Sequence, residues 1–206
     1  MELNRPLATV TPTLDGDVLA LLAQVEATFT PGQLHRVLGS HSEEGIRKAL
    51  RRLVRQGVVH SERVGNAYSY QLNRDHLAAQ PIIELANLRH TLLTRLEERL
   101  ENWRFPPAYA AVFGSTARGE MTVDSDLDLL LVRSADAPDA AWDEQVATLA
   151  ADVTRWTGND TRPLEYTVDE LARARDEPVL REVLRDGLTV AGSRAWLNRH
   201  LRPRKG

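Results

Sequence analysis

The predicted fold is decided by residues 108–132, AYAAVFGSTARGEMTVDSDLDLLLV. Two apolar runs, 108–113 and 129–132, stand at the ends of this stretch, and a turn and an acidic loop separate them. Short apolar runs bounded by turn residues are typical of buried strands. We therefore predict two strands, one leading into Gly114-Ser115 and the other following directly from Asp126-Leu127-Asp128.

The two aspartates indicate a metal site. In a strand, residues two apart point to the same face, so Asp126 and Asp128 present their carboxylates side by side while Leu127 and Leu129 point away. Two neighbouring carboxylates repel each other unless a cation bridges them. Mg²⁺ prefers oxygen ligands and is commonly held by one or two carboxylates together with substrate phosphates. The pattern therefore predicts a Mg²⁺ site that binds a phosphorylated substrate.

The turn before the acidic loop has the composition of a phosphate-binding turn. Gly114 allows the backbone to come close to a triphosphate. Ser115 and the amides that follow it, at the start of a short helix, offer hydrogen-bond donors to phosphate oxygens. Arg118 could add positive charge or brace the loop. Gly114, Ser115 and Arg118 are therefore the candidate nucleotide-binding residues.

Gly-Ser, ten intervening residues and Asp-x-Asp form an arrangement that resembles the DNA polymerase β-like nucleotidyltransferases. It most resembles the minimal nucleotidyltransferases, many of which share the pattern Gly-Ser-x-Ala-Arg-Gly, and the likeness covers about residues 108–192. The resemblance implies a mixed sheet with helices and transfer of NMP from an NTP, with ATP the first choice. It also implies Mg²⁺, with a two-metal site possible, and a protein, RNA or small-molecule acceptor. A helical partner protein of a toxin–antitoxin module is compatible with it.

The resemblance also implies a third carboxylate, on the strand after the helix that we predict over about 141–156. Residues 162–167 read as that strand, in which Leu164 and Tyr166 share one face and Glu165 takes the other. Glu165 is the only acid inside the strand, so it is the candidate that assists the attacking hydroxyl and contacts the metal. The candidate catalytic and metal-binding residues are thus Asp126, Asp128 and Glu165.

The N-terminal part of the chain predicts three helices followed by a β hairpin over residues 14–73. Thr30 and Gln33 form a capping-box pattern, Ser42 opens the third helix, and Gly65-Asn66 suits a hairpin turn. This order, with a basic third helix, resembles the winged helix-turn-helix family, in which the third helix enters the major groove of DNA. The candidate DNA-binding residues are Lys48, Arg51, Arg52, Arg55 and Arg63.

Double-stranded DNA is therefore an expected partner of the N-terminal part. From Ile46 to Arg63 there are six Lys or Arg residues and one acid, and cations placed at phosphates release condensed counterions. A solvated helix face and a protein-interaction module are the alternatives. If DNA binding is the main activity, the protein is a transcriptional regulator whose nucleotidyltransferase fold senses nucleotide or is inactive.

A leucine pattern between the two parts predicts one long helix. Apolar residues recur at steps of three and four from Leu85 to Trp103, so we expect a helix over about 82–104 that ends before Pro106-Pro107. Its apolar stripe could pack on either flanking domain or pair with a second copy of itself. We expect a linker that also supports a homodimer.

The net charge of −3 conceals a strong contrast between segments. The expected organisation is a winged helix-turn-helix at 1–75 (net +1), a connector helix at 76–105 (net 0), a nucleotidyltransferase domain at 106–192 (net −9) and a basic tail at 193–206 (net +5). The fold class is α/β, of the α+β kind.

Composition excludes several other classes of site. The chain has no cysteine, which excludes disulfides, a cysteine nucleophile and thiolate zinc sites and fits a cytoplasmic location. We see neither a signal peptide nor an apolar stretch of the roughly 20 residues needed to cross a bilayer, so no membrane partner is expected.

Overall fold

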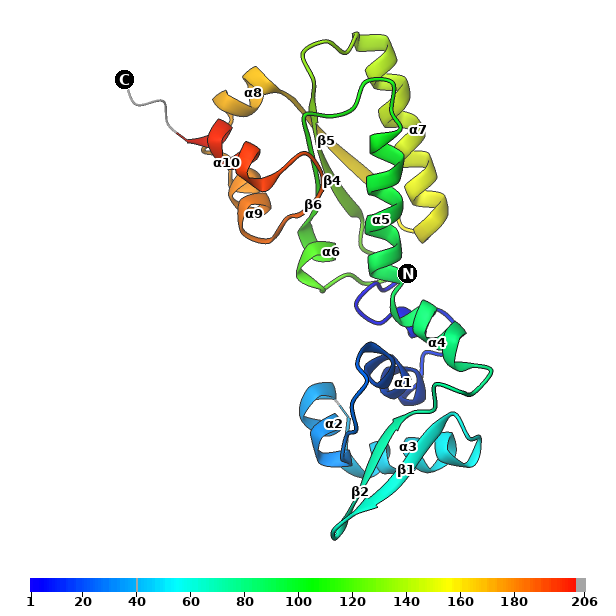
Figure 1. Ribbon diagram of the computed structural model, residues 1–206. Helices are drawn as coiled ribbons and strands as arrows, with labels where there is room; N and C mark the ends of the chain where they lie inside the picture. Colours follow the sequence, from blue (N-terminus) through cyan, green and yellow to red (C-terminus); the bar gives the residue numbers. More distant parts are fainter. Residues whose placement is uncertain (40, 203–206) are drawn as a thin grey trace. The chain divides into compact units, whose positions relative to one another are not determined.

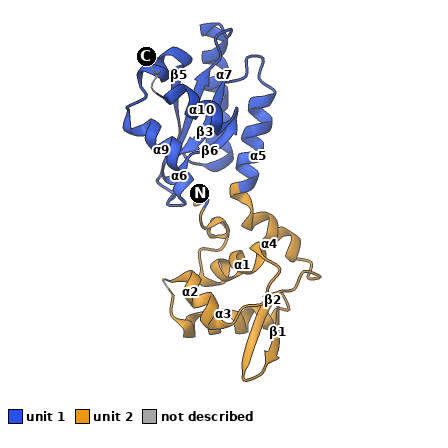
Figure 2. Cartoon of the chain, turned by 60° about the vertical axis from the view of Figure 1, so that its left-hand side comes forward, with its two compact units in different colours: residues 1, 3, 90–206 blue, residues 2, 4–89 orange. Residues whose placement is uncertain are grey.

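The computed structural model describes residues 1–39 and 41–202. The chain folds as two compact units that divide between Arg89 and His90 (Figure 2). Unit 2 comprises Glu2 and Asn4–Arg89, and unit 1 comprises Met1, Leu3 and the chain from His90 onwards. In the described part of the chain, none of the helices combines the length and the apolar character that crossing a membrane requires.

Unit 2 consists of helices and one hairpin. In the hairpin, β1 and β2 pair antiparallel, with Val64 opposite Ala67 around the Gly65-Asn66 turn. Three helices and a hairpin therefore lie where the sequence predicts them between residues 14 and 73 (Figure 1). The elements in order are η1 (Pro6–Thr9), α1 (Leu14–Gln24), α2 (Pro31–Leu38), α3 (Glu43–Arg55), β1 (Val59–Val64), β2 (Ala67–Leu72) and α4 (Ala79–Ala86).

The predicted caps fix where α2 and α3 begin. Gln33 N–H donates to Thr30 Oγ1 at 3.3 Å, and Thr30 N–H donates to Gln33 Oε1 at 2.7 Å, which completes the capping box. Ser42 Oγ accepts from the N–H of Gly45 at 3.1 Å. Both caps satisfy backbone donors that the first turn of a helix leaves without a partner.

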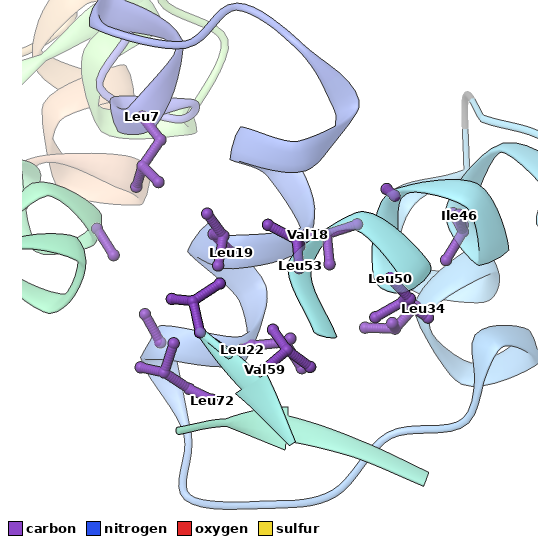
Figure 3. Packing of buried hydrophobic residues seen from close by; sticks show 14 of the residues in the cluster. Leu7, Val18, Leu19, Leu22, Leu34, Ile46, Leu50, Leu53, Val59 and Leu72 are labelled. Atoms are coloured by element: carbon purple, nitrogen blue, oxygen red, sulfur yellow. The ribbon is translucent and has the colours of Figure 1, made fainter. Parts of the chain in front are cut away.

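The core of unit 2 is apolar side chains from the helices and the hairpin (Figure 3). Leu34 of α2 and Ile46 and Leu50 of α3 are completely buried, and Leu22 of α1 and Val59 of β1 belong to the same cluster. Because the apolar face of α3 turns inward, its charged residues are on the exposed side of the helix.

Unit 1 is built on a mixed four-stranded sheet in the order β5-β4-β3-β6. β3 is antiparallel to both β4 and β6, whereas β5 is parallel to β4. This mixed sheet with helices confirms the predicted fold class. The strands are β3 (Tyr109–Phe113), β4 (Leu127–Arg133), β5 (Thr161–Thr167) and β6 (Leu188–Ala191), and the helices are α5 (Leu88–Glu101), α6 (Gly114–Arg118), α7 (Asp139–Thr157), α8 (Val168–Arg173), α9 (Pro178–Asp186) and α10 (Arg194–Leu201).

Strand β4 is covered on both faces. Leu129, Leu130 and Leu131 are completely buried. Leu130 joins the cluster on the side of α8, α9 and α10, which includes Leu180 and Leu197. Alternation along the strand places Leu129 and Leu131 on the other side, where α5 and α7 lie (Figure 1). An uninterrupted apolar run is what a strand buried on both faces requires.

The single long helix predicted over 82–104 is wrong. The structure has α4 and α5 in its place, separated at Asn87, whose φ of −98° and ψ of 12° leave the helical region. Asparagine is a weak helix former because its side chain competes for backbone hydrogen bonds. A leucine pattern alone does not reveal such an interruption, since both helices keep the same spacing.

The apolar stripe of this segment is covered within the chain. Leu85 packs against the core of unit 2. Leu96 and Leu100 are completely buried in unit 1, where Arg95 of α5 lies 5.1 Å over the ring of Trp156 of α7. In the described residues the stripe therefore leaves no exposed apolar seam, and it gives no support to the expected homodimer.

Most of the expected basic tail is part of unit 1. Ser193 Oγ caps α10 by accepting from the N–H of Trp196 at 3.2 Å, and Leu197 and Leu201 pack into the core. Folding of the basic segment against the acidic domain was one of the alternatives that the sequence left open, and the apolar spacing of Leu197 and Leu201 accounts for it. Residues 203–206 lie outside the described residues.

We predict that Leu50→Ala lowers the free energy of unfolding by about 2–5 kcal/mol, because it removes a fully buried side chain and leaves a cavity. Urea unfolding followed by far-UV circular dichroism measures the change. Val37→Ala, at a position 61% exposed, serves as the control and should cost less than about 0.5 kcal/mol. A loss below about 1 kcal/mol for Leu50→Ala would contradict its place in the core.

Candidate functional site

The turn between β3 and α6 lies directly against one of the two aspartates. The register pairs Phe113 at the end of β3 with Asp128 on β4. The next residue, Gly114, has a φ of +69°, and a Cβ at this position would lie 2.2 Å from Asp128 Oδ2. A side chain is therefore excluded both by backbone conformation and by space. The glycine lets the backbone turn beside the carboxylate.

Asp126 and Asp128 lie close enough for their charges to interact. Asp126 stands immediately before β4 and Asp128 is its second residue, so alternation puts both on one side. Burial raises the pKa of Asp128 above its usual value, and the charge of Asp126 raises it further, whereas Arg162 lowers it. Two adjacent, partly buried carboxylate groups of this kind fit a divalent cation.

The loop before Asp126 is held by a buried amide. Asn159, which is 2% exposed, donates from Nδ2 to the carbonyl oxygens of Val123 at 3.2 Å and Ser125 at 2.9 Å. Next to it, the N–H of Leu127 donates to the carbonyl of Asp160 at 2.8 Å. The segment that leads into β5 therefore positions Asp126. In the sequence Asn159 follows a predicted helix end, which gave no sign of this role.

Glu165 is not part of the aspartate site. The parallel register of β4 and β5 pairs Leu131 with Glu165 and Asp128 with Arg162. Paired residues on neighbouring strands point to the same side, so Glu165 lies on the face opposite to Asp128. Its Oε2 accepts a 2.6 Å hydrogen bond from Nε1 of Trp142 on α7. This placement corrects the prediction that Glu165 completes the metal site.

The described residues offer two carboxylates at this place and not three, since nowhere among them do three acidic or histidine side chains gather as a metal site. Alternation in the sequence separated the two faces of this strand but did not show which face meets Asp128. Alternation along residues 162–167 places Arg162 with Leu164 and Tyr166, and the structure puts that face on the same side as Asp128. The prediction therefore placed the third metal ligand on the face of β5 that points away from Asp128.

Arg118 braces the elements around the turn. Its Nε donates to Glu120 Oε2 at 2.8 Å, and its Nη1 bonds to Glu182 of α9. Of the two roles open to Arg118 in the sequence, this geometry favours bracing. Ser115 is half-buried in α6, and its carbonyl accepts from the N–H of Glu120 at 2.9 Å.

A second candidate site lies on unit 2, where α3 and the hairpin line a groove of about 1030 Å³. Four of the five predicted DNA-binding residues line it, and Arg63 does not, since its Nε bonds to the carbonyl of Gly65 in the hairpin turn. The hairpin adds Tyr68 and Tyr70, which the sequence did not single out. The predicted residues that line the groove are Lys48, Arg51, Arg52 and Arg55.

The cations of the groove differ in their partners. Arg51 pairs with Glu44 at 3.1 Å and Arg52 pairs with Asp15 at 2.5 Å. Lys48 has no ion pair in the described part of the chain. The three cations are exposed, although Asp15 is half-buried. Exposed ion pairs contribute only about 0–1 kcal/mol, so an anionic ligand can replace the partners of these cations.

Part of the sequence matches a known protein family. Residues 93–185 match the nucleotidyltransferase domain family, a range that includes the Gly114 turn, the aspartate pair and Arg162. The match indicates an enzyme of the nucleotidyltransferase kind. Enzymes of this type use an NTP and a divalent metal ion. No curated protein matches the chain.

Several solved structures are similar to part of the chain. A toxin–antitoxin complex with AMP-PNP is 16% identical, with 53% of this chain and 80% of that chain covered and a TM-score of 0.39. A tri-AMPylated Shewanella oneidensis HEPN toxin in complex with MNT antitoxin is 12% identical (55% and 80% covered, TM-score 0.37). The MntA-HepT toxin–antitoxin is 12% identical (54% and 80% covered, TM-score 0.36).

We predict that Asp128→Asn stabilises the metal-free protein at pH 7. Because the pKa of Asp128 is higher in the folded than in the unfolded chain, the folded state holds the proton more tightly, and ionisation of this carboxyl group opposes folding. The stabilisation should vanish below the unfolded pKa of about 3.8, where the group is protonated in both states. Thermal unfolding of the variant and the wild type in the presence of a chelator, at pH 7 and at a pH below 3.8, tests this prediction.

Asp124→Asn is the control, since Asp124 is an exposed acid of the loop before the pair. It should leave the unfolding midpoint nearly unchanged at both pH values. A lower midpoint for Asp128→Asn at pH 7 would show that the carboxylate stabilises the fold and would contradict the repulsion described above.

Proposed function

We propose that the chain is a Mg²⁺-dependent nucleotidyltransferase that transfers NMP from an NTP, with ATP the first choice, to an acceptor hydroxyl group. The observation that carries this proposal is the aspartate pair beside the Gly114 turn, within a segment that matches the nucleotidyltransferase domain family. The carboxylates supply oxygen ligands, and the turn supplies a backbone that a triphosphate can approach closely.

Each residue has a distinct part in the proposed reaction. Asp126 and Asp128 hold the metal ion, which when bound neutralises charge on the phosphates and the departing pyrophosphate. Gly114 and Ser115 bind the β- and γ-phosphates, while Arg118 holds the turn against α9. The acceptor hydroxyl group gives up its proton to solvent as its oxygen attacks the α-phosphorus, the bond to the bridging oxygen of the β-phosphate breaks, and pyrophosphate leaves. Most of the catalysis is positioning and charge neutralisation.

The acceptor in this proposal is a protein, an RNA or a small molecule. A toxin–antitoxin-like system, in which a partner protein carries the acceptor hydroxyl, is one form of it. A regulatory system is another form of the proposal, because basic residues line the groove on unit 2. Both forms require the same chemistry at Asp126 and Asp128.

We predict that the protein transfers label from α-³²P-ATP to an acceptor in extract of its own cells, in the presence of Mg²⁺. Asp126→Asn should lower the transfer at least a hundredfold, because the variant loses one metal ligand. Gel electrophoresis and thin-layer chromatography of the products measure the transfer and identify the class of acceptor.

Asp169→Asn, an exposed acid in the first turn of α8, is the matched control and should retain transfer. Label from γ-³²P-ATP should not be transferred, because the γ-phosphate leaves with pyrophosphate. If the wild-type protein binds ATP yet labels no acceptor in any extract fraction, the enzyme proposal fails.

A second function, binding of double-stranded DNA by unit 2, is favoured by the groove between α3 and the hairpin. Three helices and a hairpin with cations along the third helix have the element order of a winged helix-turn-helix domain. The cations are placed for phosphates, and Tyr68, which is 54% exposed, adds an apolar surface at the rim. In this function the nucleotidyltransferase unit either acts on the DNA that unit 2 binds or responds to its binding.

We predict that replacing both Lys48 and Arg55 by Gln lowers the dependence of DNA affinity on salt. Each lost phosphate contact reduces the slope of log K against log salt by about 1, so the double variant should lose about 2. Fluorescence anisotropy with a labelled duplex, between about 50 and 200 mM salt, gives the slope.

Arg74→Gln provides the control, because Arg74 belongs to unit 2 but lines a different pocket, where it pairs with Glu26. Its slope should equal that of the wild type. Absence of any anisotropy change at low salt, with every duplex tried, would exclude the DNA-binding function.

A further inference from the structure

A positive side chain of the protein lies directly against the aspartate pair. Arg162 on β5 is the register partner of Asp128 and shares its side of the sheet. Its Nη1 lies 2.9 Å from Asp126 Oδ2, and its Nε lies 3.8 Å from Asp160 Oδ2. The place on β5 that faces the two carboxylates therefore holds a guanidinium group and not a third acid.

The bond between Arg162 and Asp126 can be exchanged. The side chain of Arg162 is 65% exposed and that of Asp126 is 32% exposed. Exposed ion pairs contribute little, because water competes for both partners. A divalent ion brings twice the charge of a guanidinium group to the same oxygens, so it can displace Arg162 from Asp126 without disturbing the sheet.

The charges around the pair suit one divalent ion better than two. Asp126 and Asp128 carry two negative charges, which a single divalent ion neutralises, and Arg162 then remains as a positive charge beside it. A second divalent ion would face Arg162, and the other nearby acids are engaged or turned away: Asp160 pairs with Arg162, Glu182 is bonded to Arg118, and Glu165 lies on the opposite face. A positive charge next to the ion site disfavours the binding of a further cation.

We propose that this site binds one divalent ion and that Arg162 takes the place of a second. Arg162 pairs with Asp126 in the nucleotide-free protein and turns to the triphosphate when metal and nucleotide bind. The planar guanidinium group has five donors in a fork that matches phosphate oxygens, so it supplies the charge and the geometry that the phosphates need. This inference rests on the proposed function of the same site.

Arg162→Gln tests the exchange through two affinities that should move in opposite directions. Without nucleotide, affinity for Mn²⁺ should rise about fivefold, because Asp126 is no longer paired. With Mn²⁺ present, affinity for a non-hydrolysable ATP analogue should fall about tenfold, because a phosphate loses a charged donor. Electron paramagnetic resonance of free Mn²⁺ and calorimetry measure the two affinities.

The number of metal ions gives a second readout. The wild-type protein with the ATP analogue should bind one Mn²⁺ per chain, whereas Arg162→Asp, which puts an acid opposite Asp128, should bind two. Arg155→Gln is the control, since Arg155 is an exposed arginine of α7 that pairs with Asp152. It should change neither the affinities nor the number of ions.

The outcomes separate this inference from the proposed function. If the wild-type protein binds neither Mn²⁺ nor the ATP analogue, both fail. If it binds both ligands but holds two Mn²⁺ ions, the assignment of Arg162 is overturned while the proposed function stands. The assignment is equally overturned if Arg162→Gln leaves both affinities unchanged or moves them in the same direction.

Discussion

The register between β3 and β4 is the constraint on which the site depends. It sets Phe113 opposite Asp128, so the chain leaves β3 directly beside a carboxylate, where only glycine fits. A slip of one residue would turn the Asp128 carboxylate to the face of Leu127 and Leu129, both completely buried, and the cost of burying an unpaired charge opposes such a slip. Hydrophobic packing of one strand thus fixes the position of polar groups that contribute nothing to that packing.

The same site lowers the stability of the fold that positions it. Asp128 is partly buried beside Asp126, and burial together with the neighbouring charge raises its pKa. The surrounding structure partly offsets this repulsion: Arg162 pairs with Asp126, and Asn159 holds the loop through backbone carbonyls. Strongly coupled charges of this kind are typical of sites that bind a metal ion or a charged substrate.

The two units differ in charge in a way that the net value of −3 hides. Residues 106–192 carry a net charge of −9, whereas the exposed side of α3 is basic and lines a groove with the hairpin. These are surfaces for different ligands: carboxylates for a cation and its nucleotide, and cations for phosphates. The net charge of the whole chain therefore describes neither surface.

The sequence by itself determined the elements whose causes are local. The caps at Thr30 and Ser42 and the strands around the Asp-x-Asp motif follow from spacing within a few residues, and all are present in the structure. Alternation also showed that Glu165 and Leu164 take opposite faces. Only the tertiary structure decided which of these faces meets Asp128, because the register between β4 and β5 joins residues that are more than 30 positions apart in the sequence. This register excludes Glu165 from the aspartate site and places Arg162 there. No pattern within β5 alone reveals that arrangement.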